Sequence, residues 1–260
     1  MKRSDFVRYY KSFEDDFAFS KNQDIKLPKD YKWLRLDFFS RFLSAAVYTL
    51  AFLISSVYCR LFLHVSFENK KILKKSRKTG AFIYGNHTQP IGDVFDPALA
   101  AFPNRIYTVV SPANLGIPVI GKILPYLGAL PIPDSVRGMK SFTAAIEYRL
   151  KQKKCIVIYP EAHVWEYYTG IRPFDSTSFK FPAKFCAPVY SMTAVYKKRK
   201  GLKKPAIKIQ FDGRFYPDTS LSLRDRAESL ETRVYETLKN RAKQSDCVYI
   251  KYEKEGTVNE

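Results

Sequence analysis

The stretch from residue 81 to residue 97, AFIYGNHTQPIGDVFDP, constrains the fold of this chain more than any other. Its apolar run from Phe82 to Tyr84 ends in Gly-Asn-His, and a loop with Pro90 and Gly92 then leads to Asp93 and to the start of a helix. A short apolar run bounded by turn residues is typical of a buried strand. We therefore expect a strand that holds His87 rigidly at its carboxyl end.

The side chains at this strand end are suited to proton transfer. Histidine titrates near neutral pH, and a carboxylate beside its second nitrogen fixes the tautomer and stabilises the imidazolium. Asp93 is favoured as that carboxylate, because Asp96 stands before Pro97, where it would cap a helix. If the helix begins earlier, either aspartate could serve. The sequence has no G-x-S-x-G motif, so His87 is predicted to activate an external hydroxyl or water. The alternative is a histidine that only makes structural hydrogen bonds.

A second apolar run, Cys155 to Tyr159, ends in Pro160-Glu161-Ala162-His163. In an open α/β sheet, ligands bind at the carboxyl ends of the strands, which predicts that Glu161 and His87 lie at the same edge. Further elements are expected as strands at residues 61–67, 105–110, 187–196 and 207–211, and as helices at 97–102, at 141–153 and after Ser222. Strands that alternate with helices predict an α/β fold with a central, mostly parallel β-sheet flanked by helices.

Residues 42–59, FLSAAVYTLAFLISSVYC, carry no charge, and Arg41 and Arg60 stand at the two ends. This length is at the lower limit for a membrane span, and the flanking arginines fit a helix in or on an anionic leaflet. A membrane-associated helix is therefore expected, either spanning or monotopic, with a buried core helix as the alternative. The chain is divided accordingly into an N-terminal segment, 1–64, and an α/β domain, 65–260. No role is predicted for residues 1–35.

The charge and the cysteine content limit which partners and which cellular compartment are expected. The net charge of +19 predicts an anionic partner, such as a membrane, an acidic protein surface or a nucleic acid. A nucleic-acid partner is not expected, because the chain has a long apolar stretch and no recognisable nucleic-acid-binding motif. The four cysteines are widely spaced, without a C-x-x-C motif, and are expected to be reduced core residues, which favours the cytosolic face and argues against zinc. They are Cys59, Cys155, Cys186 and Cys247.

Short motifs follow one another along the rest of the chain. Asn86-His87 is followed by five residues and Asp93, residues 128–134 read GALPIPD, residues 159–164 read YPEAHV, and Pro173-Phe174 and Ala187-Pro188-Val189 come later. In this order they resemble the motifs of the glycerolipid acyltransferases, typified by 1-acylglycerol-3-phosphate (lysophosphatidic acid) acyltransferase. That family has Asn-His, four residues and Asp, then Ile-Pro-Val-Asp-Arg, then Phe-Pro-Glu-Gly-Thr-Arg. The resemblance spans about residues 65–252.

The chain departs from the family's pattern in two respects. One residue is added between His87 and Asp93, and the two arginines that would bind a phosphate are replaced by Ser135 and Val164. Other basic residues are then expected to bind the phosphate, because a guanidinium can do so bidentately from another position. The candidates are Arg172, Arg137 and Lys140, with His163 as either a further donor or a surface histidine.

The resemblance implies a membrane-associated O-acyltransferase. It would move a fatty acyl group from acyl-CoA or acyl carrier protein (acyl-ACP) to a lysophospholipid hydroxyl, with the conversion of 1-acylglycerol-3-phosphate to phosphatidic acid as the favoured reaction. His87 and Asp93 would be catalytic, Asn86 and Glu161 would help to bind the acceptor, and no metal or other cofactor would be needed. The expected location is the cytoplasmic face of the cell membrane. The alternative, suggested by the altered arginine positions, is an inactive lipid-binding or scaffold relative.

Overall fold

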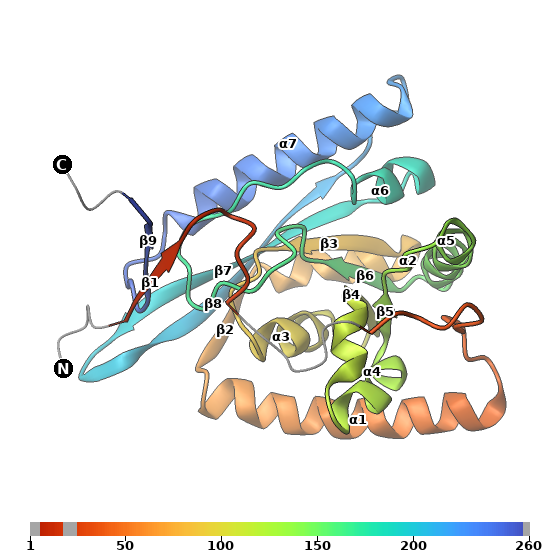
Figure 1. The fold of residues 1–260 in the computed structure, drawn as a ribbon, viewed down its shortest axis with the longest axis horizontal. Helices are drawn as coiled ribbons and strands as arrows, with labels where there is room; N and C mark the ends of the chain where they lie inside the picture. Colours follow the sequence, from red (N-terminus) through yellow and green to blue (C-terminus); the bar gives the residue numbers. More distant parts are fainter. Residues whose placement is uncertain (1–5, 18–24, 257–260) are drawn as a thin grey trace.

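The structure is a computed structural model that describes residues 6–17 and 25–256. Its centre is a seven-stranded sheet with the strand order β2-β8-β7-β3-β6-β4-β5 (Figure 1). The strands are β2 (Val65–Glu68), β3 (Ala81–Gly85), β4 (Ile106–Val110), β5 (Ala129–Pro131), β6 (Cys155–Ile158), β7 (Val189–Arg199) and β8 (Leu202–Phe215). Strands β7 and β8 pair antiparallel, and the other neighbouring strands of the sheet pair parallel. The predicted fold class is therefore confirmed.

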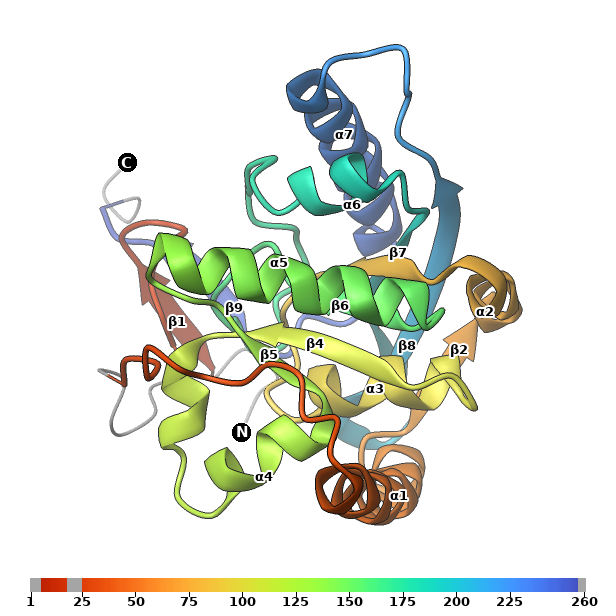
Figure 2. The ribbon, with the colours of Figure 1, turned by 90° about the vertical axis from the view of Figure 1, so that its right-hand side faces the viewer.

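Helices cover both faces of this sheet, as Figure 2 shows. On one face lie α5 (Val136–Lys151), α6 (Lys180–Phe185) and α7 (Leu223–Ala242). On the other face lie α1 (Phe38–Leu61) and α3 (Gly92–Ala101). The two remaining α-helices, α2 (Ser76–Thr79) and α4 (Ile120–Leu127), also lie in connections between strands. The domain is thus a sheet between two helical layers, as expected when parallel strands alternate with helices.

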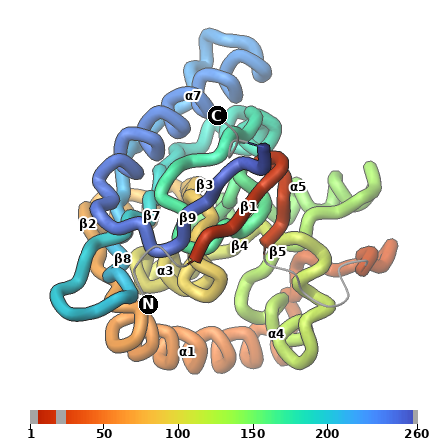
Figure 3. The backbone as a smooth tube through the Cα atoms, turned by 60° about the vertical axis from the view of Figure 1, so that its left-hand side comes forward, coloured from red at the N-terminus to blue at the C-terminus, as the bar shows by residue number. Residues whose placement is uncertain are grey.

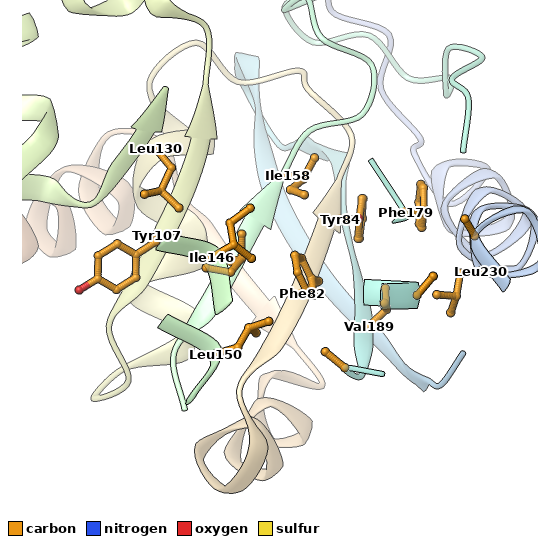
Figure 4. Packing of buried hydrophobic residues seen from close by; sticks show 14 of the residues in the cluster. Phe82, Tyr84, Tyr107, Leu130, Ile146, Leu150, Ile158, Phe179, Val189 and Leu230 are labelled. Carbon is orange, nitrogen blue, oxygen red and sulfur yellow. The ribbon is translucent and has the colours of Figure 1, made fainter. Parts of the chain in front are cut away.

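The sequence of β3 explains why it lies inside the sheet. All five of its residues are buried, as expected of a strand covered on both faces. Phe82 and Tyr84 belong to a cluster with Ile146 of α5 and Leu230 of α7 (Figure 4). Ile83 belongs to the other cluster, on the side of α1 and α3, because neighbouring side chains of a strand point to opposite faces. The loop after β3 therefore leaves from a densely packed part of the fold.

A second, two-stranded sheet brings the two ends of the chain together. Strand β1 (Val7–Tyr10) pairs in parallel with β9 (Lys251–Lys254), and the two strands lie side by side in Figure 3. Neither strand was predicted, because a four-residue strand at the end of a chain has too little periodicity to be recognised. The division of the chain at residue 64 stays a prediction.

Some local predictions were wrong. Helix α1 continues to Leu61, so the strand expected from residue 61 begins only at Val65. Asp96 lies inside α3 and does not cap it, because that helix begins at Gly92. Cys186 is exposed in the turn after α6, whereas the other cysteines are buried, so the expectation of four core cysteines fails at this position.

Candidate active site

The central feature of the site is the contact between His87 and Asp93. His87 follows β3, and the loop after it folds back so that Asp93 lies in the first turn of α3. His87 Nδ1 lies 2.7 Å from Asp93 Oδ2, which also accepts the backbone N–H of Gln89 at 2.9 Å. The structure thus places Asp93, and not Asp96, beside the imidazole. With Nδ1 held against the carboxylate, Nε2 is the nitrogen that can take up a proton from a substrate.

The two side chains differ in their contact with solvent. The His87 side chain is 21% exposed, whereas that of Asp93 is 4% exposed. Burial raises the pKa of the Asp93 carboxyl above its ordinary value, and the hydrogen bond and charge of His87 oppose this shift. A buried acid behind a partly exposed imidazole is the arrangement expected of a general base and the group that orients it.

Tyr159 supports both members of this pair, although the motif that begins with it predicted no such role for its side chain. Its ring stacks on the imidazole of His87, with the ring centroids 4.5 Å apart and the planes inclined by 17°. Its hydroxyl donates a hydrogen bond to the backbone carbonyl of Asp93. That carbonyl needs an outside donor because Pro97, four residues later in α3, has no N–H. Tyr159 therefore compensates for the proline in α3 and fixes the plane of the His87 ring.

Glu161 lies at the same edge of the sheet as His87, as predicted, because β6 and β3 are parallel neighbours. Its Oε2 accepts the backbone N–H of His87 at 3.1 Å, and its Oε1 accepts that of Arg172 at 3.0 Å. The Arg172 guanidinium forms an ion pair with Oε2 at 3.2 Å, and the two side chains are 0% and 1% exposed. Burial raises the pKa of Glu161, and the charge of Arg172 opposes this shift. Glu161 thus holds the backbone that carries His87.

Two of the predicted phosphate-binding residues, Arg172 and His163, contact other residues of the same chain. Besides its ion pair, Arg172 donates to the backbone carbonyl of Phe13 at 3.1 Å and to that of His163. His163 Nδ1 lies 3.5 Å from an oxygen of Asp16. The role of Arg172 in phosphate binding stays a prediction, and it requires that these internal contacts open. The His163 side chain is 34% exposed and so remains accessible.

The remaining candidates are not brought to the imidazole. Both polar groups of the Asn86 side chain bond to the backbone of Ala194 in β7, at 3.2 and 2.8 Å, so this side chain fixes the loop to the sheet. Arg137 and Lys140 are exposed near the start of α5. That helix follows β5, three strand spacings or roughly 14 Å from β3, at the same edge. In the described part of the chain, no group of three His, Cys, Asp or Glu side chains is arranged to hold a metal ion.

The N-terminal segment 6–17 packs over the loop that carries Glu161, and sequence reasoning missed this contact. The indole N–H of Trp165, a fully buried residue, donates to the carbonyl of Asp15 at 2.8 Å, and Arg8 forms an ion pair with Glu166. A signal was available in the density of aromatic residues. These are Phe6, Tyr9, Tyr10, Phe13 and Phe17, of which Tyr10, Phe13 and Phe17 contact the Trp165 ring. Such a density is unusual for a solvated chain terminus.

Replacing Asp96 by asparagine is expected to change how stability depends on pH. Asp96 is 1% exposed, and the thiol of Cys59 is hydrogen-bonded to its carboxyl group. Burial, and then the neighbouring Asp93, raise its pKa well above 3.8. A raised pKa in the folded state contributes stability at low pH that is lost as the pH rises toward that pKa. The variant Asp96→Asn has no ionisable group at this position and so does not lose this stability. The free energy of unfolding of the variant minus that of the unsubstituted protein should therefore increase by up to about 1.4 kcal/mol per pH unit above pH 4.

Urea unfolding of both proteins at several pH values between 4.5 and 8 would measure this change. Asp218→Asn, at an exposed carboxyl whose pKa is lowered by the neighbouring Ser220, is the control and should show no such increase. A difference between Asp96→Asn and the unsubstituted protein that stays constant over this range would contradict the expected ionisation of Asp96.

Comparisons with known proteins agree with this fold and with the family that the motifs resemble. The crystal structure of the 1-acyl-sn-glycerophosphate (LPA) acyltransferase PlsC from Thermotoga maritima is similar, with a TM-score of 0.54 and 15% sequence identity. The similarity covers 82% of this chain and 84% of that chain. No curated protein matches the sequence. The sequence model of the acyltransferase family matches residues 64–197, just over half of the chain and the part that holds His87, Asp93 and Glu161. The resemblance is therefore confirmed, and the chain belongs to the acyltransferase family.

Proposed function

We propose that the protein transfers a fatty acyl group from a thioester to the hydroxyl of a lysophospholipid. The observation that carries this proposal is the 2.7 Å contact of His87 Nδ1 with Asp93, in a chain of the acyltransferase family. The favoured acceptor is 1-acylglycerol-3-phosphate, which the similar protein from Thermotoga maritima is named for. The donor is acyl-CoA or acyl-ACP. Both are acidic, so the net charge of +19 suits either one.

The geometry supports direct transfer. His87 Nε2 removes the proton of the acceptor hydroxyl while the hydroxyl oxygen attacks the carbonyl carbon of the thioester. Asp93, held against Nδ1, stabilises the imidazolium that forms. When the tetrahedral intermediate collapses, the carbon–sulfur bond breaks and His87 returns the proton to the departing thiolate. The products are an ester and a free thiol, so the step balances with the substrates and these two residues.

Helix α1 is the element that we propose binds a membrane. Its most apolar 18-residue window has a mean hydropathy of 1.8, and only 11% of that window is buried. This low burial argues against a buried core helix, because such a helix would be covered by other side chains. The exposed apolar residues of α1 are Phe38, Phe39, Phe42, Leu43, Leu50, Leu53, Ile54, Val57 and Leu61.

The position of α1 favours a monotopic attachment. The helix runs along the base of the domain and packs on α3 and α4 (Figure 1). A helix held along the domain in this way cannot cross a bilayer without taking the domain with it. We therefore propose that its exposed face enters one leaflet, with Arg41 and Arg60 at the level of the head groups. The anionic cytoplasmic leaflet suits the net charge of +19.

The substrate prediction can be tested with the purified full chain in detergent. We expect mass spectrometry to find a diacyl product when 1-acylglycerol-3-phosphate is offered with acyl-CoA or acyl-ACP, and less product from lysophospholipids with other head groups. The His87→Ala protein is the negative control, which gives the amount of product formed without the proposed general base. A higher yield from another lysophospholipid would change the acceptor but keep the reaction. Absence of an acylated product with every donor and acceptor would contradict the proposal and favour the inactive lipid-binding relative, to which Ser135 and Val164 point.

A further inference from the structure

A recess lined by three arginines lies between α1, α4, α5 and the β4–β5 edge of the sheet. The arginines are Arg35, Arg105 and Arg149, and the wall also includes Trp33 and Ser44. The recess is shallow and open to solvent, with an enclosed cavity volume of only about 20 Å³, so a ligand would bind at its mouth. None of the residues that line it in the described part of the chain carries a carboxylate. Three positive charges around one hollow without an acid among them are unusual in a folded protein.

The recess is separate from the candidate active site. Both Ile106 of β4 and Ala81 of β3 pair with Cys155 of β6, so these residues are level across the sheet. Arg105, just before Ile106, therefore lies at the amino edge of the sheet. Strand β3 runs four residues beyond Ala81 toward the carboxyl edge, about 13 Å, and His87 lies two residues further on, in the loop after Gly85. The recess is therefore not the place where His87 acts.

The guanidinium groups retain unused hydrogen-bond donors. Arg105 donates to the hydroxyl of Ser44 at 2.6 Å and to the carbonyl of Tyr126, but its Nε is buried without a partner. The Nε of Arg149 is likewise buried without a partner. In the part of the chain that the structure describes, neither these two arginines nor Arg35 forms an ion pair. Buried, unpaired donors of like charge are costly, and an oxyanion would satisfy them.

Aromatic rings hold two of these groups in place. The guanidinium carbon of Arg149 lies 4.3 Å from the centroid of the Tyr107 ring, and that of Arg105 lies 4.6 Å from the centroid of Tyr48 in α1. Stacking uses the flat face of a guanidinium and leaves the N–H groups at its edge for another partner. Burial and the nearby charge of Arg105 lower the pKa of Arg149, so a negative charge between them would relieve both effects.

We propose that this recess binds the phosphate group of an anionic ligand, and that its natural source is the head group of a membrane phospholipid. A guanidinium binds phosphate bidentately, which suits Arg105 and Arg149. The lipid source is favoured because Ser40 and Ser44 of α1 line the recess, while Phe38, Phe39 and Phe42 in the same part of α1 are exposed. The site would therefore lie at head-group depth when α1 enters a leaflet. A soluble phosphate compound would use the same donors.

Fluorescence titration of the full chain in detergent would test this site, because Trp33 lines the recess and the chain has two tryptophans. The probes are dihexanoyl phosphatidylglycerol, inorganic phosphate and dihexanoylglycerol, which lacks the phosphate. We expect saturable binding of the phosphatidylglycerol, weaker binding of inorganic phosphate and none of dihexanoylglycerol. Arg105→Gln/Arg149→Gln should weaken phosphatidylglycerol binding about tenfold to 100-fold. The arginine variant leaves His87 and Asp93 unchanged, so binding that this variant loses is assigned to the recess and not to the active site.

The matched control is Lys239→Gln/Lys243→Gln, which removes the same charge from exposed positions, Lys239 in α7 and Lys243 just after that helix ends. Helix α7 lies on the opposite face of the sheet from α1 (Figure 2). This control should bind like the unsubstituted protein. If the double arginine variant does not fold, Arg35→Gln gives the same comparison, with about a tenfold loss expected. Inorganic phosphate that binds as tightly as phosphatidylglycerol would support the site and assign it to a soluble compound. Equal binding of dihexanoylglycerol, or unchanged binding by a folded arginine variant, would overturn the proposal.

Discussion

His87→Ala is expected to lower kcat for acyl transfer about 100-fold to 10,000-fold, the usual effect of losing a general base. The loss follows from the geometry, because His87 presents Nε2 while Asp93 holds Nδ1 at 2.7 Å. The substitution should leave the fold intact, because the imidazole is partly exposed. The hydrogen bonds of residue 87 to Glu161 and Trp165 are made by its backbone, which alanine keeps. Turnover is measured with the acceptor and donor that give the most product in the lysophospholipid panel.

The control for this variant is His64→Asn. His64 is a histidine near the start of β2, and its φ of 49° is a conformation that asparagine tolerates. It should keep turnover within about twofold of the unsubstituted protein, as a surface substitution usually does. Near-normal turnover by His87→Ala would show that another group removes the proton. Equal losses in both variants would point to a general effect of removing a histidine.

The parts of this site that follow from strand ends could be predicted from the sequence. His87 and Glu161 each stand just after an apolar run, and the pairing of β3 with β6 brings them together at one edge. Asp93 could be favoured over Asp96, but the alternative stayed open, because the choice depends on where α3 begins. A proline normally marks the first turn of a helix. Here Pro97 lies inside α3, and the carbonyl that it leaves free accepts a hydrogen bond from Tyr159.

Contacts between distant parts of the chain account for most of what was missed. Arg172 was identified as a basic residue in a suitable loop, but its partners come from residues 13, 161 and 163. No local pattern shows that a guanidinium will be paired with a buried acid, because the pairing depends on how the loop closes. The same holds for Arg105 and Arg149, which are far apart in the sequence and meet only because α5 packs beside β4.

Arg172→Met is expected to lower the free energy of unfolding by about 3–5 kcal/mol, the usual cost of removing one partner of a buried ion pair. Methionine has a similar shape but leaves the Glu161 carboxylate without its counter-charge in a site where both side chains are almost fully buried. Urea unfolding is followed by the fluorescence of Trp165, whose ring centroid lies 5.0 Å from the Arg172 guanidinium carbon. Turnover should fall as well, because Glu161 holds the backbone N–H of His87.

Arg241→Met is the matched control, since Arg241 also pairs with a carboxylate but is 24% exposed. Its hydrogen bonds to Asp212 measure 2.9 and 2.6 Å, so the contact geometry is at least as good as that of the buried pair. Because solvent stabilises the remaining carboxylate, the loss should be about 1 kcal/mol or less. The difference between the two variants therefore measures burial rather than contact distance. A loss for Arg172→Met that is no larger than that for Arg241→Met would mean that water reaches Glu161, and Arg172 would then be accessible to a substrate phosphate.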